Sequence, residues 1–257
     1  MHTAFTRPVS SSINSCELTH RNRTPIDVAL AIAQHQAYEQ CLQGLRCQLR
    51  RLPAMPDFPD AVFVEDTCIV FDELAVITRP GAASRRPETA SMADAMKSYR
   101  PLQWIESPGT LDGGDVLCVG RRIYVGQSSR TNGQGIERLR TLLTPHGHSV
   151  TAVELSGCLH LKSAATVVAD GTVLVNPEWV DPAAFGDVTI VRTDPGEPMA
   201  ANALRIGNRV VYAAGFPKTQ RRLEDAGIEV VIVDLSELAK AEGAVTCCSV
   251  VVGVVAR

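Results

Sequence analysis

The residues with the clearest chemical potential are a cysteine, a histidine and a carboxylate that lie far apart in the chain. Cys247 stands between the small-residue turn Gly243-Ala-Val-Thr and an apolar segment typical of a strand. A thiol at such a strand edge is a candidate nucleophile. His160 stands between two leucines, and Asp112 belongs to the glycine turn Leu111-Asp-Gly-Gly-Asp115. Together these side chains could supply a nucleophile, a general acid and base, and an orienting carboxylate.

Each of the three residues also has a purely structural explanation. A cysteine beside a strand is commonly a small buried apolar side chain. A lone histidine on an apolar strand is commonly a core residue that is hydrogen-bonded to the backbone. Asp-Gly-Gly is a frequent turn composition. The occurrence of all three in one chain is what favours a catalytic interpretation over these explanations.

A second group of carboxylates lies on one segment that runs from a loop into a predicted strand. Asp60, Glu65 and Asp66 stand next to apolar residues such as Phe63, where an unpaired charge would be costly. We expect the side chains of Asp60 and Asp66 to reach one pocket. Those of Glu65 and Phe63 would alternate, so that Glu65 points either into this pocket or away from it. A cationic ligand would remove the cost of burying these charges. The alternative is a solvated acidic loop.

Composition restricts the class of protein. The chain has 257 residues, of which 45% are hydrophobic and 21% charged, as in a globular protein with a large core. The formal net charge is -3 and the lysines and arginines are scattered, which argues against a nucleic-acid partner. No apolar run approaches the ~20 residues that span a bilayer, and the first residues lack the apolar core of a signal peptide. We therefore expect a cytoplasmic protein without a membrane partner.

The eight cysteines do not indicate disulfides or zinc. Most are widely spaced, and a chain of this length does not need covalent cross-links. The only close pair, Cys247 and Cys248, is adjacent, so the two side chains would point to opposite faces of a strand. We expect reduced thiols, no metal and no cofactor.

Strands and helices alternate along the whole chain. Apolar spacing predicts helices over 25–45, 89–99, 133–143 and 219–226. Short segments rich in β-branched residues predict strands at 62–64, 75–78, 123–126, 172–175, 210–213, 229–233 and 250–254. Hairpin turns are predicted at 119–122 and 169–172. The pattern of two strands and a helix recurs at roughly 45 to 50 residues. It favours a closed ring of small α/β units in a single domain over residues 1–257.

Six ordered motifs resemble the dimethylarginine dimethylaminohydrolases, which belong to the guanidine-modifying pentein superfamily. The resemblance covers nearly the entire chain, and the order and spacing of the motifs make it specific. The motifs are Pro59-Asp-Ala-Val-Phe-Val-Glu-Asp66, Ser84-Arg-Arg-Pro-Glu-Thr89, Leu111-Asp-Gly-Gly-Asp115, Arg130-Thr-Asn132, Leu159-His-Leu-Lys162 and Thr246-Cys-Cys-Ser249. The resemblance implies a five-bladed α/β propeller with its active site in the central channel. It also implies hydrolysis of methylated arginine to citrulline and a methylamine.

The resemblance assigns roles to individual residues. Cys247 would be the nucleophile that forms a covalent thiouronium, His160 the acid and base, and Asp112 the carboxylate that orients the imidazole. The remaining matched residues would bind the substrate: Asp60 and Asp66, with Phe63 and Glu65 on the same segment, at the guanidinium; Arg85 and Arg130 at the carboxylate; and the carbonyl groups of Leu18 and Ala241 at the amino group. Leu18 lies in the polar segment 16–22, which we expect to form a lid.

Several alternatives stay open. Glu242 stands where members of the family often carry aspartate, so substrate selectivity, including other small guanidines, is open. Arginine deiminases carry a large helical insertion for which 257 residues leave no room. Amidinotransferases are longer and need a site for an amine acceptor. A catalytically silent pentein that binds methylarginine as a sensor is a further possibility, and a homodimer through the outer face of a blade is plausible.

Overall fold

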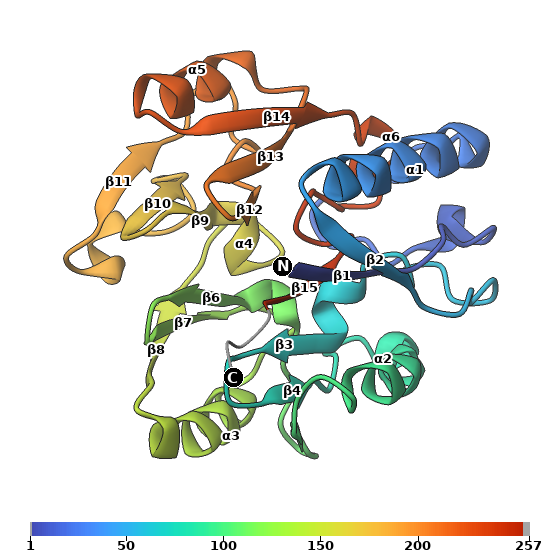
Figure 1. The fold of residues 1–257 in the computed structure, drawn as a ribbon, viewed down its shortest axis with the longest axis vertical. Helices are drawn as coiled ribbons and strands as arrows, with labels where there is room; N and C mark the ends of the chain where they lie inside the picture. The colour runs from blue at the N-terminus through green and yellow to red at the C-terminus, as the bar shows by residue number, and fades with distance from the viewer. Residues whose placement is uncertain (1, 254–257) are drawn as a thin grey trace.

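Five sheets of three strands each surround a central channel in the computed structural model, which describes residues 2–253 (Figure 1). In each sheet the middle strand pairs antiparallel with an inner strand, which lines the channel, and parallel with an outer strand. The inner, middle and outer strands of the five sheets are β15 (Val250–Gly253), β1 (His2–Thr6) and β2 (Cys47–Arg51); β3 (Cys68–Val70), β4 (Ala75–Ile77) and β5 (Leu102–Trp104); β6 (Val116–Val119), β7 (Arg122–Gln127) and β8 (Ser149–Glu154); β9 (Ala165–Ala169), β10 (Thr172–Val175) and β11 (Thr189–Arg192); and β12 (Ala203–Ile206), β13 (Arg209–Ala213) and β14 (Glu229–Val233).

Helices connect the parallel pairs because two parallel strands can be joined only by a crossover. The crossover helices are α1 (Val28–Gly44), α2 (Thr89–Met96), α3 (Gly133–Leu143) and α5 (Pro217–Asp225). In the sheet of β9, β10 and β11 a short 3-10 helix, Pro182–Phe185, takes this place. Two further short helices, α4 (Leu161–Ala164) and α6 (Ser236–Ala239), lie in the connections that lead to inner strands.

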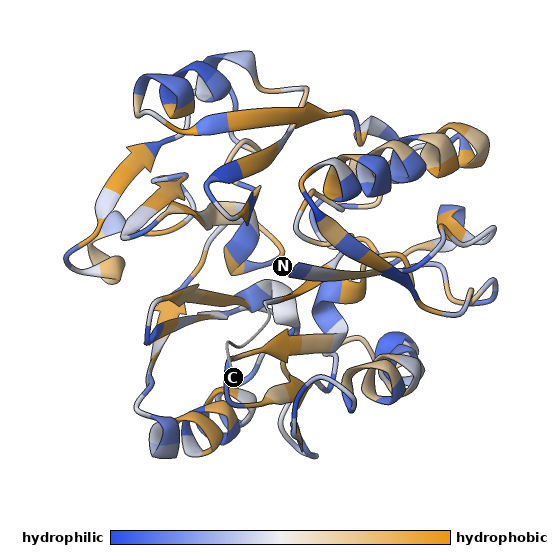
Figure 2. Ribbon diagram, viewed as in Figure 1, coloured by the Kyte–Doolittle hydropathy of each residue, from blue (hydrophilic) through white to orange (hydrophobic). Residues whose placement is uncertain are grey.

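Apolar residues of the crossover helices pack onto the sheets. In α3, Ile136, Leu139 and Leu143 are buried against Val116 and Val125 of the adjacent sheet, as the helical spacing of these residues requires. Asn132 caps this helix by accepting a hydrogen bond from the backbone amide of Gly135. Figure 2 shows the same division in general, with hydrophobic strands inside and a hydrophilic α5 on the outside.

The ring is closed by the two ends of the described chain. β15 pairs antiparallel with β1, so that Val250 lies opposite Phe5 and Gly253 lies opposite His2. The first sheet therefore takes its inner strand from the end of the sequence and its other two from the beginning. This pairing carries Cys247, which directly precedes β15, to the mouth of the channel.

Most of the predicted elements are confirmed. The four predicted helices overlap α1, α2, α3 and α5, and the strands predicted at 75–78, 123–126, 172–175, 210–213 and 229–233 correspond to β4, β7, β10, β13 and β14. Both predicted hairpin turns join paired strands. The predicted strand at 250–254 is confirmed as far as Gly253, and residue 254 lies outside the described residues. The predicted five-bladed α/β propeller is confirmed.

The strand predicted at 62–64 is wrong. Val62 lies in a turn, and Phe63 is the N-cap of a 3-10 helix, Val64–Thr67. The segment does not pair with a strand because its backbone bonds to the loop that carries the thiol: the amide of Glu65 donates to the carbonyl of Cys247 at 3.1 Å. An apolar run alone does not distinguish such a buried loop from a strand.

Within residues 2–253, no helix is both long and apolar enough to cross a membrane. The homodimer and the cytoplasmic location stay predictions.

Candidate active site

The loops that precede the inner strands converge at one end of the channel. Asp66 precedes β3, Asp112 precedes β6, His160 precedes α4 and β9, and Cys247 precedes β15. Between these loops lies a narrow cavity lined by Glu17, Asp60, Phe63, Asp66, Arg85, Arg130, Leu159, His160, Ala241, Glu242, Gly243 and Cys247. Eight of these residues were expected at the site from the sequence. The fold thus brings the thiol and the imidazole, which are far apart in the chain, into one cavity.

Cys247 lies in the turn before β15 and not in the strand itself, so the expected alternation of Cys247 and Cys248 across a strand is wrong. Cys247 is half-buried and lines the cavity, whereas Cys248 is fully buried, with its thiol 3.5 Å from the carbonyl of Ala244. Burial raises the pKa of the Cys247 thiol well above its ordinary value, and the carboxylates of Glu65 and Asp66 raise it further. These surroundings therefore keep the thiol neutral at neutral pH.

His160 caps the first turn of α4 and is not part of a strand. Its ring nitrogen Nε2 lies 3.1 Å from Oδ2 of Asp112, and Nδ1 lies 3.9 Å from Oδ1 of Asp66. Burial alone would lower the pKa of this imidazole. The surrounding carboxylates of Asp66, Asp115 and Asp112 outweigh burial and raise the pKa to about 9. At neutral pH the structure therefore holds an imidazolium beside a neutral thiol.

Asp112 is fully buried and has little freedom to move. Its Oδ2 bonds the imidazole of His160, while its Oδ1 accepts from the backbone amide of Gly81 at 2.9 Å. Its own amide donates to the hydroxyl of Thr131 at 3.1 Å. Both carboxylate oxygens are therefore used, and this geometry fixes the plane of the imidazole ring.

Asp115 supports the site from behind and was not among the expected site residues. Its carboxylate accepts from the hydroxyls of Ser128 at 2.5 Å and Thr131 at 2.7 Å, and from the amide of Leu161 at 3.0 Å. Burial raises the pKa of Asp115 to about 6. Because Leu161 follows His160, Asp115 holds the backbone that carries the imidazole. The second aspartate of the glycine turn was the sequence signal for this contact.

Arg85 lines the cavity, but protein groups bind most of its guanidinium. It pairs with Asp66 at 2.5 Å and with Glu88 at 2.9 Å, and it donates to the carbonyls of Asp60 and Phe63. Burial would raise the pKa of Asp66, but His160 and Arg85 outweigh it and lower that pKa. Arg85 thus keeps Asp66 ionised next to the imidazole, a role that the sequence did not indicate.

The segment that precedes α1 contributes Glu17 to the cavity. Residues 16–27, which include the predicted lid 16–22, form neither helix nor strand. The amide of Glu17 donates to both oxygens of Asp60, at 3.3 and 3.1 Å, and Arg130 donates to the hydroxyl of Thr19 at 3.3 Å. The side chain of Leu18 does not line the cavity but packs against the apolar cluster that contains Ala241.

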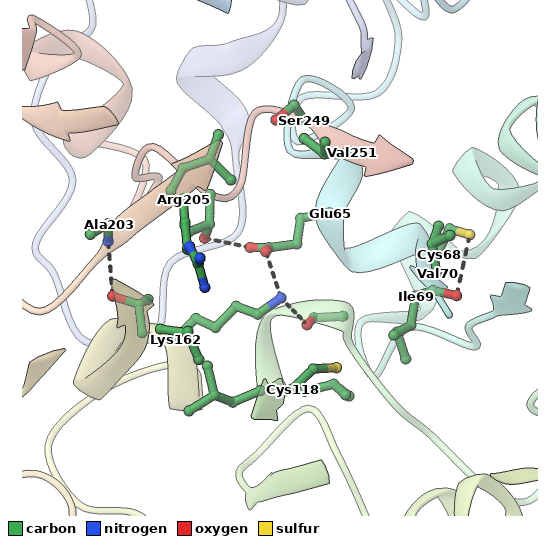
Figure 3. A pocket seen from close by; sticks show the side chains of 17 residues that line it. Glu65, Cys68, Ile69, Val70, Cys118, Lys162, Ala203, Arg205, Ser249 and Val251 are labelled. Atoms are coloured by element: carbon green, nitrogen blue, oxygen red, sulfur yellow. Dashed lines mark hydrogen bonds and ion pairs between the residues drawn. The ribbon is translucent and has the colours of Figure 1, made fainter. Parts of the chain in front are cut away.

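Glu65 lines a second cavity in the channel, where it forms with Lys162 and Thr246 a hydrogen-bonded group that we call the floor (Figure 3). Its carboxylate accepts from the ammonium group of Lys162 at 2.7 Å and from the hydroxyl of Thr246 at 2.7 Å. Lys162 also donates to the carbonyl of Gly113 at 3.2 Å. This second cavity has a volume of about 310 Å³ and lies between the inner strands. The structure does not place Glu65 in the cavity with the thiol.

Asn202 completes the floor and carries no motif that could have revealed it. Its side-chain amide donates to the carbonyl of Lys162 and to the hydroxyl of Thr246, each at 2.9 Å, and its carbonyl oxygen accepts from the amide of Thr246 at 3.1 Å. Lys162 and Thr246 lie within two residues of His160 and Cys247 in the chain. The floor therefore ties together the segments that carry the acid and the nucleophile.

Gly114 is required for the close approach of these groups. A Cβ atom at this position would lie 2.6 Å from Nδ1 of His160 and 2.9 Å from Oδ1 of Asp66. We expect Gly114→Ala to displace the imidazole and to lower kcat by about 10²-fold, the loss that follows from a misplacement of about 1 Å. Gly133→Ala is the control, because no atom lies within 4 Å of its added Cβ. Wild-type kcat in Gly114→Ala would contradict the assignment.

Asp66, Asp112 and His160 are the one group of three possible metal ligands among residues 2–253, with donor atoms within 4.8 Å of one another. In the structure the two nitrogens of the His160 imidazolium face the carboxylates of Asp112 and Asp66. The expectation that no metal or cofactor takes part stays a prediction.

The five three-stranded units and the cavity shared by Cys247 and His160 agree with the pentein class that the sequence motifs resemble. The family model described as arginine deiminase matches residues 48–201, more than half of the chain. The chain is also 43% identical to the N(G),N(G)-dimethylarginine dimethylaminohydrolase of Streptomyces coelicolor, over 96% of this chain and 95% of that protein. Its identity to the enzyme of the same name from Pseudomonas aeruginosa is 36%, over 96% of this chain and 98% of that protein. The protein belongs to the dimethylarginine dimethylaminohydrolase family.

Solved structures agree with this family. A cysteine-to-serine mutant of the Pseudomonas aeruginosa enzyme, complexed with citrulline, superimposes with a TM-score of 0.93 at 35% identity and covers 97% of this chain and 98% of its own. The N-terminal domain of ArgZ, an arginine dihydrolase, has a TM-score of 0.87 at 17% identity, over 97% of both chains. This second likeness shows the fold alone.

Proposed function

We propose that the protein hydrolyses Nω-methylated arginine to citrulline and a methylamine through a covalent intermediate on Cys247. The observation that carries this proposal is the single cavity that holds a thiol, an imidazolium and several carboxylates. The names of its relatives and the citrulline bound in the Pseudomonas aeruginosa structure support it. The reaction is the displacement of an amine from a guanidinium carbon by water.

Substrate binding would activate the nucleophile. Burial and the nearby carboxylates raise the pKa of the thiol and so oppose its ionisation. A guanidinium held by Asp60 and Asp66 would offset those negative charges, and together with the imidazolium of His160 it would lower the pKa of the thiol. The thiol proton would leave to solvent and the thiolate would remain above the plane of the cation.

The first half of the reaction would form the covalent intermediate. The thiolate of Cys247 attacks the guanidinium carbon, and the new C–S bond gives a neutral tetrahedral adduct. His160 donates its proton to the methylated nitrogen, and the C–N bond breaks as the amine leaves. A cationic thiouronium and a neutral imidazole remain.

The second half would return the enzyme to its starting state. His160 takes a proton from water, and the hydroxide adds to the thiouronium carbon to give a second tetrahedral adduct. When this adduct collapses, the C–S bond breaks, the carbonyl group of citrulline forms, and the hydroxyl proton restores the thiol. The released amine takes up the proton that the thiol had given to solvent, so protons and charge balance.

The other residues would orient the substrate. Arg130 is the better of the two arginines for the substrate carboxylate, because its guanidinium has one side-chain partner, Thr19, whereas Arg85 is bound by Asp66 and Glu88. The carbonyls of Leu18 and Ala241 would accept from the amino group. Glu65 would act indirectly, through the floor.

The decisive experiment is incubation with asymmetric dimethylarginine, monomethylarginine and arginine, followed by assay of citrulline and of the released amine. We expect citrulline and dimethylamine or methylamine from the methylated substrates, and little product from arginine. Binding of methylarginine without product would instead support the sensor, and turnover of arginine alone would support a deiminase.

A further inference from the structure

Glu242 makes a set of contacts that catalysis does not explain. Its carboxylate accepts three backbone hydrogen bonds from the segment before α1: from Thr19 at 3.0 Å, from His20 at 2.6 Å and from Arg21 at 2.7 Å. These residues are more than 220 positions away in the chain. A carboxylate that accepts several amide bonds is a strong anchor, because charge-assisted hydrogen bonds are about twice as strong as neutral ones.

The segment held by Glu242 is a loop with a closed base and an anchored tip. At the base, the guanidinium of Arg23 donates to the carbonyl of Cys16 at 2.6 Å. On the inner side, the amide of Glu17 bonds Asp60. The tip, residues 19–21, reaches Glu242. Loss of the Glu242 carboxylate would therefore free the tip and leave the base in place.

The backbone conformation of Glu242 is unfavourable for a glutamate, which indicates that the side chain contributes something that a glycine could not. Its φ is 58°, in the left-handed region that residues other than glycine, asparagine and aspartate rarely adopt. The next position, Gly243, could not carry the acidic side chain instead, because a Cβ there would lie 2.2 Å from the ring of Phe63. The chain thus keeps a long acidic side chain where a glycine would fit the backbone better.

We propose that Glu242 is a positioning residue that latches the lid over the catalytic cavity and thereby sets the affinity for the substrate. Glu242 lines the cavity together with Glu17 of the lid. The latch holds residues 19–21 directly and thereby limits the motion of the adjoining Leu18. Glu242 makes no hydrogen bond with Cys247, His160 or Asp112, so the latch acts on binding and not on the chemical step. Both of its oxygens are used by the lid, which distinguishes this role from direct capture of the substrate amino group.

The test compares Glu242→Gly, Glu242→Gln and Glu242→Asp with the wild type. Glycine removes the carboxylate and its three hydrogen bonds but suits the positive φ, so the two effects partly offset each other and we expect the variant to fold with a melting temperature within a few degrees of the wild type. Amide hydrogen exchange at residues 19–21 should become at least about tenfold faster in the Gly and Gln variants. Aspartate keeps the charge and tolerates this φ, so exchange in Glu242→Asp should stay close to the wild-type rate.

The kinetic arm rests on the proposed function. We expect KM for dimethylarginine to rise about tenfold in Glu242→Gly, and kcat to change less than twofold. The tenfold rise in KM corresponds to a loss of about 1.4 kcal/mol in binding free energy. Direct capture of the amino group by Glu242 would also raise KM, but it would leave hydrogen exchange at residues 19–21 unchanged. A rise in KM without faster exchange at these residues would therefore show direct binding and overturn the latch.

Glu197→Gln is the matched control. Glu197 also accepts backbone bonds from a distant segment, Lys218 at 3.0 Å and Thr219 at 2.8 Å, but it does not line the catalytic cavity. Its replacement should speed exchange near residue 218 and leave both residues 19–21 and KM unchanged. The exchange measurement needs no turnover, so it decides the latch even if methylarginine is not the substrate. Unchanged exchange at residues 19–21 in Glu242→Gly overturns the proposal.

Discussion

Replacement of Cys247 by serine is expected to lower kcat for dimethylarginine by on the order of 10⁴-fold or more. A guanidinium carbon is a poor electrophile because resonance spreads its charge, so the reaction needs a strong and polarisable nucleophile. A serine hydroxyl has nearly the same size as the thiol but ionises far less readily. The variant should therefore fold and bind substrate but fail to form the covalent adduct.

Citrulline release under single-turnover conditions measures this loss, and intact-protein mass after rapid quenching detects the adduct. We expect a substrate-dependent mass increase in the wild type that is absent in Cys247→Ser. Cys248→Ser is the neighbouring control: this thiol is fully buried and faces the carbonyl of Ala244, so its replacement should preserve turnover. A Cys247→Ser enzyme within tenfold of wild-type kcat would exclude the nucleophile.

Replacement of His160 by glutamine is expected to lower kcat by about 10² to 10⁴-fold, the usual contribution of a general acid and base. Glutamine can still bond Asp112 but cannot donate a proton to the departing amine. A substrate with a thiolate leaving group needs no such proton, so the first half of its reaction should suffer less. Equal losses with amine and thiolate leaving groups would contradict the role of His160 as an acid.

The pH dependence provides a second measurement on the same residue. The pKa of His160 is raised to about 9, so the proton is present at neutral pH and is lost as the pH rises through 9. We expect kcat/KM of the wild type to fall on the alkaline side near pH 9, and this limb to be absent in His160→Gln. Retention of the same limb in the variant would assign it to another group.

The same shift has a consequence for stability. A histidine whose pKa is higher in the folded than in the unfolded state stabilises the fold below the unfolded value near 6.5. This stabilisation, on the order of 3 kcal/mol from the shift to about 9, is lost as the pH rises from about 6.5 to 9. Denaturant unfolding at pH 6 and pH 9.5 should therefore show a larger difference in the wild type than in His160→Gln.

The cavity residues differ in how well the sequence indicated them. Cys247, His160 and Asp112 were identifiable because ordered motifs surround them, and the structure places the first two in one cavity with Asp112 bonded to the imidazole. Asn202 has no motif, since its contribution consists only of contacts with Lys162 and Thr246. Such a residue is recognisable only when the chain segments that it joins are in place.

The partners of the charged residues were the least predictable part of the site. The prediction that Arg85 and Glu65 contact the substrate stays a prediction; in the structure Arg85 pairs with Asp66 and Glu88, and Glu65 pairs with Lys162 in the floor. Residue type and spacing predict that a charge needs a partner, but they do not predict which partner. That choice depends on distances between loops from different sheets, which no local pattern encodes.

The sequence by itself determined the repeating α/β units, the crossover helices and the residue types of the site. These features follow from apolar periodicity, turn chemistry and motif order, which act over a few neighbouring residues. Only the tertiary structure decided that the last described strand completes the first sheet, that residues 62–67 form a turn and a 3-10 helix instead of a strand, and that Glu242 holds a segment more than 220 residues away. The physical reason is that strand pairing, burial and hydrogen-bond partners at the channel depend on the closed ring as a whole.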